Sequence, residues 1–148
     1  MTIRYDKPHL ATRAGNEFFR WLAEAGIAVA GSRAIRVRGR KTGKRRGVVV
    51  NLLSFDGRRY LVSPRGNTQW ARNARAAGVI EIGPRWRSRD VRVVELVDEA
   101  KPEVLQRYLG RWFWEVKGHV GGLTPASTDQ ELRAAASAIP VFELRELD

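Results

Sequence analysis

Apolar and polar residues alternate along the middle of the chain in short runs separated by turn residues. Ile35 and Val37 alternate with arginines, and three valines follow at 48–50. This period of two predicts half-buried strands, because successive side chains of a strand point to opposite faces. We expect strands over 34–39, 46–55, 59–63, 79–82, 86–96 and 141–147.

Glycines mark tight turns between these strands. Asp56-Gly57 predicts a type I′ hairpin turn, whose two central residues need positive φ, and Gly43 serves the preceding turn. Strands joined by hairpins, with helices between some of them, predict a mainly β, α+β fold: an antiparallel barrel with helices around it. A length of 148 residues suits one domain. We divide it into an arm and helix over 1–30, barrel strands over 31–97, and C-terminal helices with a closing strand over 98–148.

The first predicted helix, over 16–26, has two interpretations. Phe18, Phe19 and Trp21 cluster on it. An amphipathic helix with exposed aromatic residues would lie on a membrane surface, whereas a helix that covers an open barrel end would bury the same residues. We favour the second interpretation and keep peripheral membrane association through this helix as the alternative.

Apolar residues at spacings of three and four predict three further helices. One follows a cap at Asn67 or Thr68 and ends at Gly78, and a short Ala-rich helix covers 129–138. The longest begins at Asp98 and has an apolar stripe that is typical of a core-facing helix. The stripe consists of Val104, Leu105, Tyr108, Leu109, Trp112, Phe113 and Val116.

Positive charge is concentrated in the first predicted hairpin. The chain has 27 Lys and Arg against 16 Asp and Glu, a net charge of +11. Eight of the cations fall between Arg33 and Arg46, and no acid occurs from 25 through 55. These like charges repel one another unless an anion binds among them, so we interpret the hairpin as a site for a phosphate or polycarboxylate. A solvated basic face is the alternative.

The remaining composition narrows the classes of protein. The absence of cysteine excludes disulfides and thiolate metal sites and favours a cytoplasmic protein, and two histidines argue against a His-rich metal centre. No apolar run approaches the length of a membrane span, and the start of the chain lacks the apolar core of a signal peptide. We expect a monomer or homodimer without a metal.

A second candidate site follows the third predicted strand. Residues 60–73 run from that strand through a loop at 63–66 into a helix start that carries Trp70. Backbone N–H groups at a helix N-terminus attract anions, and Gly66 lets a ligand approach the backbone. The alternative, which spacing alone favours, is a helix-capping loop with Trp70 in the core.

Four segments, taken in order, resemble the deazaflavin-dependent nitroreductase family. They are Gly-Arg-Lys-Thr-Gly-Lys at 39–44, Asp-Gly at 56–57, Leu-Val-Ser-Pro-Arg-Gly at 61–66 and Trp-Ala-Arg-Asn at 70–73. The resemblance implies an FMN-binding-like split β-barrel and coenzyme F420, a deazaflavin with a phosphate and a polyglutamate tail; FMN is the alternative cofactor. Family members often have proline where Arg45 and Val49 stand here, which bears on how the ring is seated.

The resemblance also implies which residues bind the cofactor. The turn and the arginine that closes the hairpin hold the phosphate and tail in the family, and they match Arg40, Lys41, Thr42, Lys44 and Arg46. The next strand lies against the ring, and it matches Val48, Val49, Val50 and Asn51. The loop and helix start complete the pocket with Ser63, Pro64, Arg65, Gly66, Gln69, Trp70 and Asn73. We expect Arg65 to point at the phosphate or tail and the Gly66 backbone to face the ring.

The activity implied is hydride transfer from reduced F420 to an electron-poor acceptor: a quinone, a nitroaromatic or an activated enone. Tyr108, Trp112 and His119 are candidate proton donors, because they fall in the region that covers the pocket in relatives; a structural or solvent-exposed role is the alternative for each. Two other functions stay open, an F420 carrier without a substrate and a basic nucleic-acid-binding barrel. An FMN or haem split-barrel enzyme is a further alternative.

Overall fold

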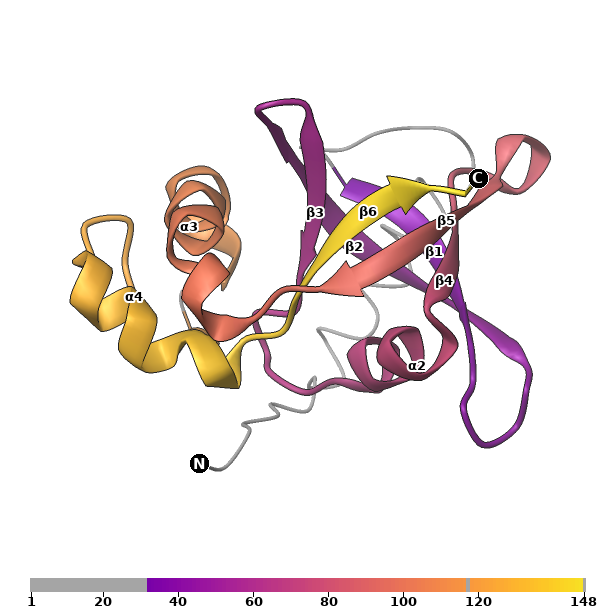
Figure 1. Ribbon diagram of the computed structural model, residues 1–148, viewed down its shortest axis with the longest axis horizontal. Coiled ribbons are helices and arrows are strands. Elements are labelled where there is room, and N and C mark those ends of the chain that lie inside the picture. Colours follow the sequence, from indigo (N-terminus) through magenta and orange to yellow (C-terminus); the bar gives the residue numbers. More distant parts are fainter. Residues whose placement is uncertain (1–31, 117, 148) are drawn as a thin grey trace.

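Six antiparallel strands close into a barrel in the computed structural model, which describes residues 32–116 and 118–147 (Figure 1). Around the barrel the order is β1-β2-β3-β6-β5-β4, and β4 pairs back onto β1. The strands are β1 (Ser32–Arg38), β2 (Arg45–Phe55), β3 (Arg58–Val62), β4 (Val79–Ile82), β5 (Arg89–Glu95) and β6 (Val141–Glu146). The predicted mainly β class and antiparallel barrel are therefore confirmed.

The fifth strand begins later than the sequence predicted. Trp86 lies in the 3-10 turn η1 (Arg85–Arg87) and is 67% exposed, so a strand from residue 86 was wrong. The chain turns at Gly83, which has a φ of 108°, and the N–H of Arg87 donates to the carbonyl of Pro84 at 2.9 Å. This bond closes a short turn before the strand can start. The other strand boundaries agree with the predictions to within two residues.

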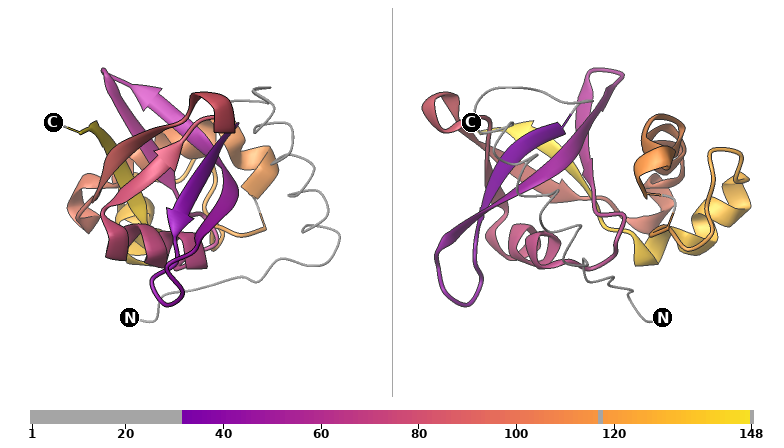
Figure 2. Two further views of the ribbon diagram at one scale, coloured as in Figure 1. Left: turned by 90° about the vertical axis from the view of Figure 1, so that its right-hand side faces the viewer. Right: turned by 180° about the vertical axis from the view of Figure 1, so that it is seen from behind.

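Helix α2 (Gln69–Ala77) packs against one end of the barrel (Figures 1 and 2). Of the two predicted caps, Thr68 is the one used: its side chain accepts a hydrogen bond from the N–H of Ala71. The helix ends at Gly78 in the left-handed region, as predicted. Ala71 and Ala74 are buried against the apolar interior of the barrel.

Helices α3 (Pro102–Val116) and α4 (Asp129–Ala135) lie to one side of the barrel, away from α2 (Figures 1 and 2). The prediction that the long helix begins at Asp98 was wrong. A separate 3-10 turn, η2 (Asp98–Ala100), comes first, and α3 starts at Pro102, whose missing N–H is harmless at a first helical position. The Ala-rich helix also ends early, because residues 136–138 form a third 3-10 turn, η3 (Ala136–Ala138).

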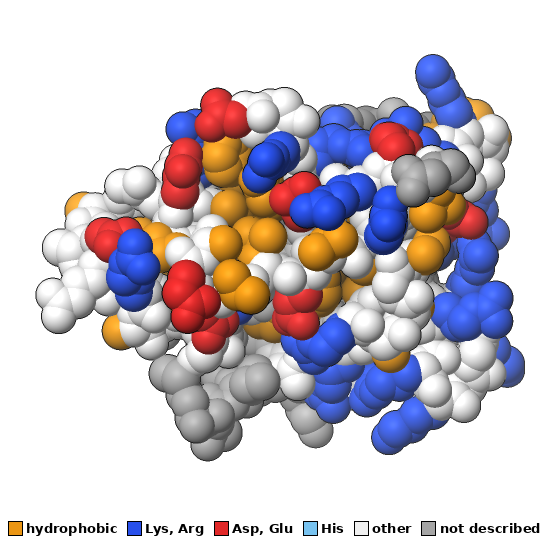
Figure 3. Space-filling model, viewed as in Figure 1, with side chains coloured by type: hydrophobic (Ala, Val, Ile, Leu, Met, Phe, Trp, Pro, Cys, Tyr) orange, Lys and Arg blue, Asp and Glu red, His pale blue; other side chains and the backbone are white. Residues whose placement is uncertain are grey.

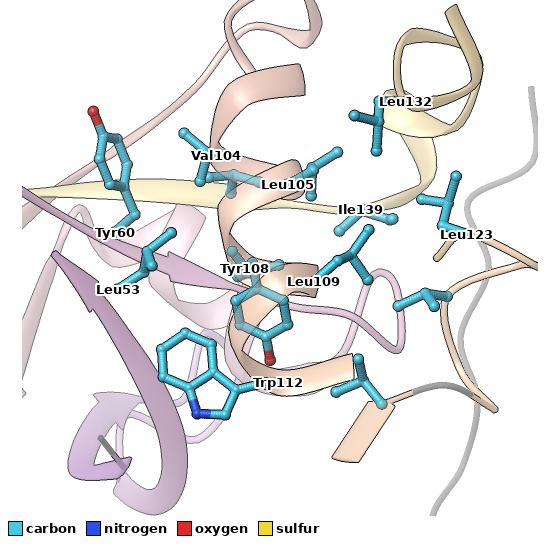
Figure 4. Packing of buried hydrophobic residues seen from close by; sticks show 14 residues of the cluster. Leu53, Tyr60, Val104, Leu105, Tyr108, Leu109, Trp112, Leu123, Leu132 and Ile139 are labelled. Carbon is cyan, nitrogen blue, oxygen red and sulfur yellow. The ribbon is translucent and has the colours of Figure 1, made fainter. Parts of the chain in front are cut away.

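Two apolar clusters share strand β2. Val50, on one face, packs inside the barrel with Leu61 and Phe142. Leu53, on the other face, packs with Tyr108 and the rest of the α3 stripe outside the barrel (Figure 4). The predicted stripe is buried except for Phe113, which is half-buried. Alternate residues of β2 therefore belong to an inner face and an outer face.

Two predictions fall outside the described residues: the arm and helix over 1–30, and the membrane-surface alternative for that helix. Among the described residues, no helix is both long enough and apolar enough to cross a membrane. The division of the chain into one domain with three parts stays a prediction.

Candidate functional site

The tip of the β1–β2 hairpin, residues 38–46, carries exposed positive charge. Its cations are Arg38, Arg40, Lys41, Lys44, Arg45 and Arg46. Figure 3 shows Lys and Arg gathered over the right-hand and lower right edges of the molecule, where Figure 1 places this hairpin and α2. Gly43 adopts a φ of 73° in the turn, and its N–H donates to the carbonyl of Gly39 at 2.9 Å. The turn is thus built by its glycines, and its charged side chains are left on the surface.

The pairing of β1 with β4 places an acid beside the hairpin, and this acid neutralises part of the positive charge. Glu81 of β4 lies opposite Arg36, and its carboxylate contacts Arg36 Nε at 2.5 Å and Arg45 Nη1 at 2.8 Å. The hydrogen bond from Arg36 holds the pKa of Glu81 below its ordinary value. The sequence count of eight cations therefore overstates the free charge of the hairpin. Five exposed cations form no ion pair with any described residue: Arg38, Arg40, Lys41, Lys44 and Arg46.

One of these five cations is held in place by helix α2. Asn73 Oδ1 accepts from the backbone N–H of Arg40 at 3.1 Å and from its Nη1 at 2.8 Å. Gln69 Oε1 accepts from the same Nη1 at 2.9 Å. The structure thus brings Arg40 together with two further predicted site residues, which lie 29 and 33 positions later in the sequence. These hydrogen bonds fix the hairpin against the helix.

We expect Asn73→Ala to loosen this connection. Asn73 is 6% exposed, so its loss leaves the Arg40 N–H without its buried acceptor and should cost about 1–3 kcal/mol of unfolding free energy in urea. Gln69→Ala is the matched control. Gln69 is exposed, and among the described residues its side chain is hydrogen-bonded to the Arg40 guanidinium alone, so its removal should cost less than about 1 kcal/mol. Equal stability of the two variants would show that the amide does not hold the hairpin.

The loop at 63–66 is closed by its own hydrogen bonds. Ser63 is fully buried, and its Oγ donates to the Gly66 carbonyl at 2.6 Å and lies 3.0 Å from Thr68 Oγ1. The N–H of Gly66 donates to the Ser63 carbonyl at 3.1 Å. These groups have partners within the loop, which favours the capping-loop interpretation for both residues. Pro64 and Arg65 are half-buried. Since Gly66 has a φ of 101°, any side chain there strains the backbone, with or without a ring nearby.

Trp70 packs against the barrel core, as the capping-loop interpretation expected. It is half-buried, and its ring centroid lies 5.8 Å from that of Phe142, inside the barrel. This contact anchors the first turn of α2 to the barrel core. Contact between Trp70 and a cofactor ring stays a prediction.

The run 48–51 divides between the two faces of β2. Val48 and Val50 pack toward the barrel interior. Val49 and Asn51 therefore occupy the outer face, where Val49 is half-buried. A flat ring on one side of the strand can contact either the inner pair, Val48 and Val50, or the outer pair, Val49 and Asn51, but not both.

A polar cluster lies between the outer face of β2 and α3. Asn51 is 8% exposed, and its Nδ2 donates to Oε2 of Glu115 at 3.1 Å. Tyr108 lies beside both: burial raises the pKa of its hydroxyl above the ordinary value, an effect that the Asn51 amide partly offsets. Sequence reasoning named Asn51 and Tyr108 separately and missed Glu115. A signal was present, since Glu115 stands two helical turns after Tyr108.

The candidate proton donors are mostly buried. Tyr108 and Trp112 are 3% and 1% exposed, and their ring centroids lie 5.0 Å apart (Figure 4). His119 is half-buried just beyond α3, where its backbone N–H donates to the Val116 carbonyl. This burial favours a structural role for the two aromatic residues, and the identity of a proton donor stays a prediction.

Comparison with known proteins shows the fold. No family model and no curated protein matches the chain. A solved protein of unknown function from Agrobacterium tumefaciens shares 15% identity over 95% of this chain, which spans 59% of that protein's length, with a TM-score of 0.54. An F420-H2 dependent reductase, FDR-A, shares 18% identity over 78% of this chain and 94% of its own, with a TM-score of 0.52.

A conserved hypothetical protein from Mycobacterium tuberculosis gives the same TM-score of 0.52, at 14% identity over 100% of this chain and 87% of its own. Together with the closed six-stranded barrel, these likenesses decide the architecture. The chain is a split β-barrel. The fold that the family resemblance implied is therefore confirmed.

Proposed function

We propose that this split barrel is an F420-dependent oxidoreductase that passes hydride from the reduced deazaflavin to an electron-poor acceptor, such as a quinone, a nitroaromatic or an activated enone. The observation that carries the proposal is the group of five exposed hairpin cations without an ion-pair partner among the described residues. Support comes from the sequence motifs that resemble deazaflavin-dependent nitroreductases and from the shared fold of the F420-H2 dependent reductase.

The hairpin residues fit a polyanion in both charge and order. Lys41, Lys44 and Arg46 lie within six positions of one turn and offer charge-assisted hydrogen bonds to phosphate and carboxylate oxygens. Arg40 is already held by Gln69 and Asn73, so less rotamer freedom is lost when it binds an anion. In this proposal these residues, with Thr42 at the turn, hold the phosphate and the polyglutamate tail.

When bound, the deazaflavin supplies the hydride chemistry. The residues of the chain bind the cofactor and orient its ring. Val49 offers half-buried apolar surface on the outer face of β2, and Asn51 offers a held amide one strand repeat further on. We assign the ring to this outer face, with Arg65 turned toward the phosphate or tail. Ser63 and Gly66 contribute by holding the start of α2.

The two alternative functions differ in what they require of the hairpin. A nucleic-acid-binding surface interleaves aromatic residues with cations for base stacking, and residues 38–46 contain no aromatic residue. A cofactor carrier would use the same cations but would not turn over a substrate.

A turnover assay separates the enzyme from the carrier: purified protein is mixed with reduced F420 and with menadione or a nitroaromatic. We expect cofactor reoxidation well above the protein-free rate, and tight F420 binding without turnover would favour the carrier.

Salt should weaken binding of F420 more than binding of FMN. Exposed charges are screened over about 10 Å at about 0.1 M ionic strength, and F420 presents more negative charge to the hairpin than one phosphate does. Fluorescence titrations at about 50 and 200 mM salt should show several-fold weaker F420 binding at the higher value. Salt-independent F420 binding would mean that the tail does not lie on the hairpin.

A further inference from the structure

Glu115 occupies an electrostatically unusual position for this protein. It lies in the last turn of α3, is exposed, and forms no ion pair with any described residue. A carboxylate at this end of a helix opposes the macrodipole, and no base in the last turn compensates for it. Local stability therefore does not explain an acid here.

The structure nevertheless fixes this carboxylate. Oε2 of Glu115 accepts from Nδ2 of the buried Asn51 at 3.1 Å. The helix also departs from regular geometry one turn earlier, at Trp112, with φ −123° and ψ 18°. Trp112 is 1% exposed, so its surroundings hold the kink, and the kink sets the direction of the last turn. An exposed acid is thus anchored by a buried amide and by a distorted helix.

The carboxylate lies next to the strand face that we assign to the ring. Val49 and Asn51 are successive outer-face residues of β2, about 7 Å apart along the strand. The hairpin cations lie beyond the other end of this segment, from Arg46 toward the turn. Strand β2 therefore has cations at one end of the assigned ring position and a fixed carboxylate at the other.

We propose that Glu115 selects the electron acceptor by charge, favouring acceptors that carry a positive charge or a hydrogen-bond donor near the reducible group and disfavouring anionic ones. This inference rests on the proposed function, because it needs the acceptor to bind against the outer face of β2. The other charged groups on the same helix do not supply this preference: Arg107 pairs with Glu103, and the guanidinium of Arg111 lies over the Trp112 ring.

The test uses three naphthoquinones matched in reactivity: one neutral, one with a quaternary ammonium group and one with a sulfonate. Their kcat/KM is measured on the full chain with reduced F420, and their Kd is measured by tryptophan fluorescence with oxidised F420 bound and with no cofactor. Glu115→Gln removes the charge and keeps an oxygen that can accept from Asn51. Glu103→Gln, at the other end of α3, is the matched control.

We expect the cationic quinone to be preferred over the anionic one by about tenfold at low salt, in both kcat/KM and Kd. Glu115→Gln should abolish the preference while leaving F420 affinity unchanged, and Glu103→Gln should keep it. An unchanged preference in Glu115→Gln, or none in the wild type, overturns the proposal. The cofactor-free Kd values separate this inference from the proposed function. If the protein does not bind F420 but its cofactor-free Kd still favours the cationic quinone in a Glu115-dependent way, the proposed function is refuted and the charge-selective binding site at Glu115 is retained.

Discussion

The double variant Lys41→Ala/Arg46→Ala should bind F420 at least about a hundredfold more weakly than the wild type, because charge-assisted hydrogen bonds are worth about 1.5–3 kcal/mol each. Both side chains are exposed at the hairpin tip and touch no described acid. Fluorescence titration of oxidised F420 at low salt measures the loss. Each single variant should show part of it.

Stability separates a binding role from a structural one. Because the two cations repel their neighbours, removing them should leave the free energy of unfolding in urea unchanged or slightly higher. Arg58→Ala/Arg87→Ala is the matched control: it removes the same net charge from exposed positions outside the hairpin tip, at the start of β3 and in η1. If the control weakens F420 binding equally, the effect reflects overall charge and the hairpin is not the site.

Phe142→Ala should cost about 3–5 kcal/mol of unfolding free energy, since it empties a large volume from the barrel interior. Phe142 is 0% exposed and packs with the core residues of the strands and with the Trp70 ring of α2. Urea unfolding followed by tryptophan fluorescence gives the value. Because α2 carries Asn73 and Gln69, F420 affinity should fall as well.

The variant could leave too little stability to measure, so Phe142→Leu gives a second point with a smaller expected loss of about 1–1.5 kcal/mol. Leu147→Ala serves as the exposed control, at 49% exposure, and should change stability by less than about 0.5 kcal/mol. A loss below about 1 kcal/mol for Phe142→Ala would contradict a close-packed barrel interior.

Local chemistry made much of the fold predictable. Asp56 and Gly57 adopt φ of 51° and 73°, as a type I′ turn requires, and Gly78 ends α2 in the left-handed region. These features depend on a few neighbouring residues. The sequence did not predict the late start of β5 or the late start of α3. Pro84 and Pro102 set the backbone at these two starts, and the spacing of apolar residues does not report such an effect.

The site was predictable in part, because its charge is local while its partners are distant. The turn of cations is contiguous in sequence, but the pairing of Arg36 with Glu81 depends on which strands close the barrel. The contact between Asn51 and Glu115 joins residues 64 positions apart. Residue type and spacing carry no information on such pairings, so a count of charges overstated the free cations and the acid beside β2 was missed.

Parallel titration of the purified full chain with F420 and with FMN tests the central claim most directly. At low salt we predict that F420 binds at least about tenfold more tightly than FMN, because the hairpin offers more cations than one phosphate engages. The advantage should disappear in Lys41→Ala/Arg46→Ala. Equal affinities of the wild type for the two cofactors, or no binding of F420, would contradict the account.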